Sequence, residues 1–242
     1  MKRIATLFIF LVYSIFAGAQ WNKDSNIDKK CSHFKSLTDK MSFDPDYYWQ
    51  SEYLFDYDVT SYLLDIEVSD TTTYVAGNVI INCVALVALD TFAFELIEQQ
   101  QIDSIIFNGT VYTNYTRNDG NVLVPVNEVP EGTPISTQIF YHGKPPTGGF
   151  FSGVTTDYSP GWQKHVTWTL SEPFAAKSWF PVKQVLQDKA DSAWVFLTTP
   201  STNKVGSQGL LTNVVDLGNG KLKYEWKTAY PIDYYLISFA VA

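Results

Sequence analysis

The sequence has few of the residues on which many enzyme classes depend. Its 242 residues include only three histidines, His33, His142 and His165, and two cysteines. None of the histidines belongs to an H-E-x-x-H or H-x-H arrangement, so we expect no metal ligands and no tetrahedral zinc site within this chain. A G-x-S-x-G nucleophile elbow and a Gly-rich phosphate loop are also missing from the sequence. No residue of the chain is therefore predicted to be catalytic.

Positive charge is also scarce. Lysine and arginine number 17 against 25 aspartates and glutamates, which gives a formal net charge of -8. Nucleic acids and anionic lipid surfaces are bound through clusters of Lys and Arg. The acidic balance therefore argues against both as partners.

A long apolar run occurs at the N-terminus, where Lys2 and Arg3 precede residues 4–16 and the small residues "AGA" follow. This run is too short to span a bilayer, which needs roughly 20 residues. Its order of charged, apolar and small residues is typical of an export signal. We expect residues 1–19 to be a signal peptide, with an exported protein, periplasmic or extracellular, that has no membrane span after cleavage. An uncleaved anchor is the alternative.

The two cysteines, Cys31 and Cys83, are too few for a small scaffold held by disulfides. A single bridge between them and a pair of unpaired thiols both remain open. The unpaired state is favoured, because Cys83 lies in an apolar run and Cys31 in a polar one. Cys83 is then expected to pack as a small hydrophobic residue.

No segment sustains a helical period for three turns. Residues 20–55 are mostly polar and are interpreted as an N-terminal extension. Residues 56–242 consist of short runs rich in Val, Ile, Thr, Tyr and Phe, such as "YDVTSYLLDIEVS", separated by turn signals such as "NDG" and "DLGNG". The pattern predicts an all-β fold, a large twisted antiparallel sheet or sandwich, with at most a short helix near 179–187.

One stretch carries a motif. Residues 169–184, "TLSEPFAAKSWFPVKQ", are similar to the pattern T-Q-S-E-P-x-x-A-R-x-W-F-P-C-x-D. Three other stretches follow the same order: "YVAGNVIINCVAL", "WVFLTTPSTNKVGSQGLL" and "WKTAYPIDYYLISFAVA". Together they resemble the N-terminal β-domain of the zinc-dependent aminopeptidase N family, and the resemblance extends over about three quarters of the chain.

The resemblance implies a role for Glu172. In this family the side chain at that position reaches into the active site of a following thermolysin-like catalytic domain and binds the α-ammonium group of a peptide N-terminus. A carboxylate suits this task, because it accepts charge-assisted hydrogen bonds from an ammonium group. Supporting positions around it are Ser171, Pro173, Phe180 and Pro181, which would hold the loop rigid. From composition alone, an exposed loop acid is the alternative.

Four positions depart from the pattern. Leu170 replaces Gln, Lys177 replaces Arg, Val182 replaces Cys and Gln184 replaces Asp. Lys177 and Gln184 cannot form an ion pair with each other, so the sequence predicts a less rigid loop than in the family.

The catalytic signatures of the family would follow residue 242. We therefore expect this chain to be an N-terminal fragment or domain of an exported zinc aminopeptidase, inactive alone and without a cofactor, its zinc bound in the missing catalytic domain. The alternative is a noncatalytic secreted β-sandwich that binds a partner through exposed aromatic residues, namely Tyr47, Trp49, Tyr53 and Phe150.

Overall fold

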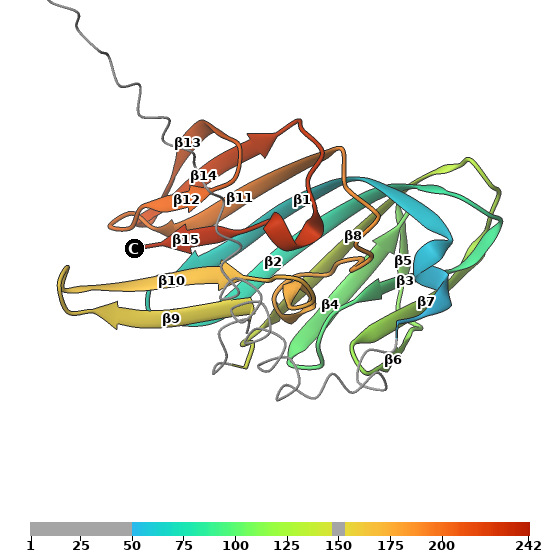
Figure 1. Ribbon diagram of the computed structural model, residues 1–242, viewed down its shortest axis with the longest axis horizontal. Coiled ribbons are helices and arrows are strands. Elements are labelled where there is room, and N and C mark those ends of the chain that lie inside the picture. The colour runs from blue at the N-terminus through green and yellow to red at the C-terminus, as the bar shows by residue number, and fades with distance from the viewer. Residues whose placement is uncertain (1–49, 147–152) are drawn as a thin grey trace, which may run out of the picture. The chain divides into compact units, whose positions relative to one another are not determined.

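The computed structural model describes residues 50–146 and 153–242, which form fifteen strands and three short 3-10 helices (Figure 1). In chain order the elements are η2 (Glu52–Phe55), β1 (Tyr57–Ser69), β2 (Thr72–Ala85), β3 (Leu89–Glu95), β4 (Gln100–Phe107), β5 (Thr110–Tyr112), β6 (Thr116–Asn118), β7 (Asn121–Val129), β8 (Pro134–Gly143), β9 (Gly153–Ser159), β10 (Lys164–Leu170), η3 (Ala176–Ser178), β11 (Ser192–Pro200), β12 (Val205–Ser207), β13 (Leu210–Gly218), β14 (Lys221–Thr228), η4 (Tyr234–Leu236) and β15 (Phe239–Val241).

The strands form three sheets. The largest has eight strands in the order β13-β14-β11-β1-β2-β8-β4-β5, the second has the order β12-β15-β10-β9, and the third has the order β3-β7-β6. All pairs in the large sheet are antiparallel except β1 with β11, which run parallel. A parallel pair needs a crossover connection between its strands. Here the connection contains four other strands of the large sheet, β2, β4, β5 and β8, and five strands of the smaller sheets, β3, β6, β7, β9 and β10.

Strand β1 shows why these runs fold as strands. Tyr62, Leu64, Ile66 and Val68 are buried, and the residues between them are partly or fully exposed. This two-residue period places one face of the strand against the core and the other toward solvent. A register shift near Thr60 keeps Val59 on the buried face as well.

Tight turns join neighbouring strands where the sequence supplies glycine. Asn108 and Gly109, between β4 and β5, both have positive φ angles of 47° and 79°. Asp119 and Gly120, between β6 and β7, have positive φ angles of 48° and 77°. Two-residue hairpin loops favour such pairs, because their twist matches that of the strands.

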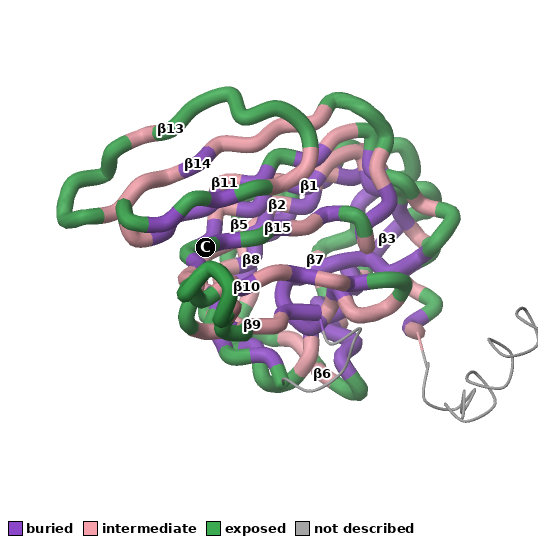
Figure 2. Tube along the Cα trace, turned by 60° about the vertical axis from the view of Figure 1, so that its left-hand side comes forward, coloured by how far each residue is buried: buried purple, intermediate pink, exposed green. Residues whose placement is uncertain are grey.

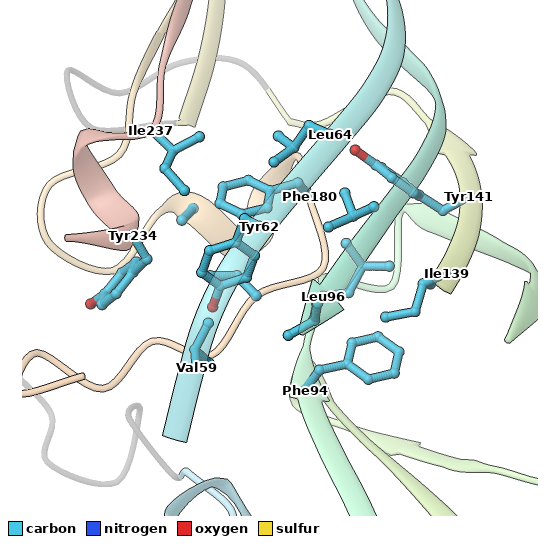
Figure 3. Packing of buried hydrophobic residues seen from close by; sticks show 14 of the residues in the cluster. Val59, Tyr62, Leu64, Phe94, Leu96, Ile139, Tyr141, Phe180, Tyr234 and Ile237 are labelled. Atoms are coloured by element: carbon cyan, nitrogen blue, oxygen red, sulfur yellow. The ribbon is translucent and has the colours of Figure 1, made fainter. Parts of the chain in front are cut away.

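The core lies between the large sheet and the two smaller ones. One cluster of buried residues draws on β1, β2 and β8 of the large sheet, on β3 and β7, and on β9 and β15. Figure 3 shows part of it, with Tyr62 and Leu64 of β1 beside Phe180 of the segment after β10, and Phe94 of β3 beside Ile139 of β8. Burying each such side chain contributes roughly 1.5–3 kcal/mol.

The all-β prediction is confirmed, with two refinements. The large sheet is mixed, because β11 runs parallel to β1. Residues 179–187, for which at most a short helix was predicted, contain no helix, and the nearest one, the 3-10 helix η3, ends at Ser178. In the part of the chain that the structure describes, no helix has the length and apolar character needed to cross a membrane.

Candidate functional site: the Glu172 loop

The motif predicted from sequence forms an irregular segment after β10, which we call the Glu172 loop (residues 171–184). Its first residue is tied down twice. The Trp179 Nε1–H donates to Ser171 Oγ at 2.9 Å, and the Ala175 N–H donates to the Ser171 carbonyl at 3.0 Å. Ser171 is only 1% exposed and Trp179 is fully buried. The small hydroxyl side chain predicted to support the loop thus receives the hydrogen bond of a buried indole.

Glu172 itself is exposed to solvent. The peptide bond between Glu172 and Pro173 is cis, and the Pro173 carbonyl accepts a hydrogen bond of 2.6 Å from Tyr234 Oη. Within residues 50–146 and 153–242, no hydrogen bond or ion pair involves the Glu172 carboxylate. The backbone on both sides of Glu172 is therefore held in place while its carboxylate remains open to a ligand.

A second acidic group lies near the loop. The pKa of Tyr235 is raised by partial desolvation and by the negative charge of Asp233, with a smaller contribution from Glu172. Lys189 Nζ pairs with Asp233 Oδ2 at 3.2 Å. Asp233 and Lys189 thus form an ion pair near the loop, and Lys189 offsets part of the effect of Asp233 on Tyr235.

The predicted supporting aromatic residue is deep in the core. Phe180 is fully buried, with its ring centroid 4.5 Å from that of Trp179 and 5.9 Å from that of Tyr62 (Figure 3). Pro181, the next residue, is also buried. Rings in such offset or edge contacts add to the free energy of burial. The loop is consequently attached to the core of the large sheet rather than lying over it.

The sequence reasoning missed Glu95. This residue ends β3, is 0% exposed, and its Oε1 lies 3.3 Å from Lys177 Nζ. Gln184 donates its backbone N–H to Glu95 Oε2 at 3.0 Å and its side-chain amide to Glu95 Oε1 at 3.3 Å. The Gln184 Oε1 in turn accepts the Lys177 N–H at 3.1 Å.

These contacts correct the expectation of a less rigid loop. Lys177 and Gln184 do not pair as two charges, but Glu95 supplies the missing carboxylate to both. One signal was available, because Glu95 is the single charged residue in the apolar run "FAFELI". A charge in such a run is rarely buried without a partner, but the sequence did not show which residue the partner was.

Solved structures of two other proteins have a similar fold. A variant of the M1 zinc metallopeptidase from Deinococcus radiodurans, bound to a Tyr-Ser-Ala substrate, matches with a TM-score of 0.66 and 21% identity, over 77% of this chain and 42% of that one. Leukotriene A4 hydrolase from Saccharomyces cerevisiae matches with a TM-score of 0.60 and 19% identity, over 82% of this chain and 31% of that one. The fold is that of an M1 metallopeptidase N-terminal domain.

This fold confirms the resemblance to the aminopeptidase N family that the sequence motifs indicated. No family model matches the chain, and no curated protein is significantly similar to it. The chain spans less than half the length of the M1 peptidases it resembles. We refer to residues 50–242 as the M1-type domain.

The M1-type domain offers no ligand set for a metal in its described residues. No group of three or more His, Cys, Asp or Glu side chains lies close enough together there to hold an ion. His142 Nδ1 is 3.0 Å from Asp103, and the His165 ring packs 5.0 Å from that of Tyr158. His33 lies outside the described residues. The described residues thus do not fit the zinc of an M1 enzyme.

The strongly shifted pKa values of the M1-type domain belong to its core. Burial raises the pKa of Tyr57, Tyr62 and Tyr141, and it raises the pKa of the Cys83 thiol to about 12. Cys83 is 2% exposed and has a free thiol, and Cys31 lies outside the described residues. A thiol with so high a pKa is almost wholly protonated at neutral pH, so it is not a nucleophile.

Of the four aromatic residues named for the alternative binding module, the structure describes only Tyr53. Tyr47, Trp49 and Phe150 lie outside the described residues, and Tyr53 is half-buried in η2. Tyr53 packs beside the small cluster formed by Leu54, Ala93 and Val185. The described part of the proposed aromatic surface therefore contributes to packing.

Proposed function

We propose that this chain is the substrate-anchoring domain of an exported zinc metallo-aminopeptidase that removes residues from peptide N-termini. Glu172 is the anchor, and a thermolysin-like catalytic domain that follows in the full-length enzyme supplies the zinc and the reacting groups. The observation that supports this most is the open carboxylate of Glu172, on a loop whose backbone is fixed on either side.

The chemistry follows from charge and hydrogen bonding. A free α-ammonium group has a positive charge and three N–H donors, whereas an internal peptide nitrogen has one N–H and no charge. A carboxylate therefore distinguishes the two, because it accepts short charge-assisted hydrogen bonds only from the former. The variant of the Deinococcus enzyme in the comparison is bound to a Tyr-Ser-Ala substrate.

The fixed backbone matters for the same reason. Holding a charged group in place before the ligand arrives avoids the entropy cost of ordering it on binding. Ser171, Phe180 and Pro181 hold Glu172 from the core side, and Pro173 holds it through Tyr234. These residues act on substrate through Glu172 and touch no substrate themselves.

The test begins with the coding region beyond residue 242. An open reading frame with H-E-x-x-H would permit expression of the full-length product, and Glu172→Ala would then be compared with the unchanged enzyme on an aminoacyl substrate. We expect kcat/KM to fall by about 30-fold or more, the equivalent of losing a charged hydrogen-bonded contact. Glu172→Gln should retain part of the activity, since an amide oxygen still accepts a hydrogen bond.

Two outcomes would overturn the proposal. A product that ends at Ala242 cannot carry out the reaction, and it would direct attention to the binding-module alternative. An unchanged kcat/KM in Glu172→Ala would remove the anchoring role even if the enzyme hydrolyses peptides.

A further inference from the structure

Among the acidic residues that form ion pairs in the described part of the chain, Glu95 has the least exposed side chain. Its side chain is 0% exposed, and four donors surround its two oxygens. These are Lys177 Nζ at 3.3 Å, the Gln184 backbone N–H at 3.0 Å, Gln184 Nε2 at 3.3 Å and Gln50 Nε2 at 3.1 Å. A carboxylate removed from water is very costly unless it is paired and hydrogen-bonded in this way.

The main chain of Glu95 is also hydrogen-bonded to the Glu172 loop. The Glu95 N–H donates to the Val182 carbonyl at 2.7 Å, and the Val182 N–H donates to the Glu95 carbonyl at 3.0 Å. β3 is thereby joined to the far end of the Glu172 loop by two main-chain bonds, and to its middle by the Lys177 side chain. The donors come from two separate parts of the chain, at Gln50 and within the Glu172 loop at Lys177, Val182 and Gln184.

Between Ser171 and Gln184 the loop is held by main-chain bonds as well as by side chains. Among them, the Ile97 N–H donates to the Lys177 carbonyl at 2.9 Å, and Tyr141 Oη donates to the Trp179 carbonyl at 2.8 Å. Ser171 is held by Trp179, Pro173 by Tyr234, and Lys177 by Glu95 and Gln184. Glu172 lies between Ser171 and Pro173, and Lys177 is the next of these residues toward the C-terminus. Without the Glu95 carboxylate, Lys177 would keep its main-chain bond to Ile97 but lose the side-chain contact that ties it to β3.

We propose that Glu95 is a positioning residue for Glu172, which fixes the anchor by holding Lys177 and Gln184. This inference rests on the proposed function, because it assumes that Glu172 binds the substrate ammonium group. Glu95 touches no substrate. Its carboxylate fixes the position of the Glu172 loop through Lys177 and Gln184, and the position of the loop fixes that of the Glu172 carboxylate.

The test compares two variants of the full-length product, Glu95→Gln alone and Glu95→Gln combined with Gln184→Glu. Glu95→Gln keeps the shape but removes the charge that Lys177 pairs with, so KM for an aminoacyl substrate should rise roughly tenfold, the scale of one lost hydrogen bond to a charged group, with a smaller change in kcat. The double change Glu95→Gln with Gln184→Glu returns one carboxylate to the same cluster, and KM should recover in part.

A thermodynamic cycle separates positioning from general weakening. In a Glu172→Ala background, Glu95→Gln should have little further effect on KM, because the group it positions is gone. Leu197→Ala, a core change in β11 away from the loop, is the control for lost stability, and it should leave KM unchanged. Lys177→Met, which breaks the pair from the more exposed partner, replaces Glu95→Gln if that variant does not fold.

The outcomes distinguish the two proposals. If Glu172→Ala leaves kcat/KM unchanged, the proposed function fails and the positioning role fails with it. If Glu172→Ala lowers kcat/KM but folded Glu95→Gln, or Lys177→Met in its place, leaves KM unchanged, only the positioning role is overturned. Equal effects of Glu95→Gln with and without Glu172 would also overturn it.

Discussion

The Glu172 loop and the β13–β14 hairpin contrast in a way that local structure does not suggest. The loop has almost no repeating structure, yet Trp179, Phe180 and Gln184 within it are fully buried. The hairpin has regular strands, yet eight of the nine residues of β13 are exposed (Figure 2). Leu210 in β13 is 74% exposed. Regular backbone and burial are thus separate properties, and in this domain the irregular segment belongs to the core.

The physical reason is the number of neighbours outside the segment itself. β13 is an edge strand that pairs only with β14, so its hydrogen bonds are local and both of its faces meet solvent. The Glu172 loop contacts β1, β3 and η4 through Tyr62, Glu95 and Tyr234. Three changes, in order of expected effect, test this contrast.

The largest effect is expected from removing the indole of the loop. Trp179→Ala should lower the free energy of unfolding by about 3–5 kcal/mol, because a fully buried ring leaves a cavity, and Ser171 Oγ loses its donor. Leu210→Ala, also a large-to-small change but in β13, should stay within about 0.5 kcal/mol. Urea unfolding of the 242-residue chain measures both, and similar losses for the two would contradict the contrast.

Next are two lysines that form ion pairs in different surroundings. Lys183 pairs with Asp188, with side chains 4% and 6% exposed, whereas Lys221 pairs with Glu67 on the surface at 2.6 Å. Lys183→Met should cost about 3–5 kcal/mol, because it leaves a buried carboxylate alone. Lys221→Met should cost about 0–1 kcal/mol.

The first of these losses should depend on pH. Burial raises the pKa of Asp188 and Lys183 lowers it, so the pKa in Lys183→Met rises further above its value in the unfolded chain. A carboxyl group with a raised folded pKa favours the folded state as it becomes protonated. The deficit of Lys183→Met should therefore shrink as the pH falls from 7 toward about 4, and a constant deficit would show that Asp188 does not carry the effect.

The smallest effect concerns two tyrosines close in sequence. Tyr234→Phe removes the hydrogen bond to the Pro173 carbonyl and should cost between about 1 and 3 kcal/mol. Tyr230→Phe is the matched control, since Tyr230 follows β14 and is 81% exposed, and it should change stability by less than about 0.5 kcal/mol. Thermal unfolding of both variants under the same conditions provides the comparison.

The degree to which sequence predicted these regions differs between them. β1, β2 and β8 follow alternating runs, and the predicted turns "NDG" and "DLGNG" join β6 to β7 and β13 to β14, because strand period and turn chemistry are properties of neighbouring residues. Phe180 is buried, as expected of a supporting position, whereas the exposed position of Glu172 is compatible both with the anchor and with the alternative of a loop acid. The parallel pairing of β1 with β11 was not predicted, since it joins strands more than a hundred residues apart.

Glu95 illustrates what could not be predicted. A charged residue in an apolar run indicates that it is paired if it is buried. The partner, Lys177, is however 82 residues away in the sequence. No rule of local spacing connects the two. For the same reason, Gln184 in place of an acid predicted a less rigid loop. The acid that compensates, Glu95, lies on β3, far from Gln184 in the sequence.

The sequence by itself determined the strand runs, the tight turns, the acidic balance and the motif that contains Glu172, because each depends on residues that are close along the chain. Only the tertiary structure decided that the Glu172 loop is anchored in the core and that Glu95 provides its charge. A buried carboxylate is stable only where donors from distant segments converge on it. That convergence exists only once the sheets have assembled.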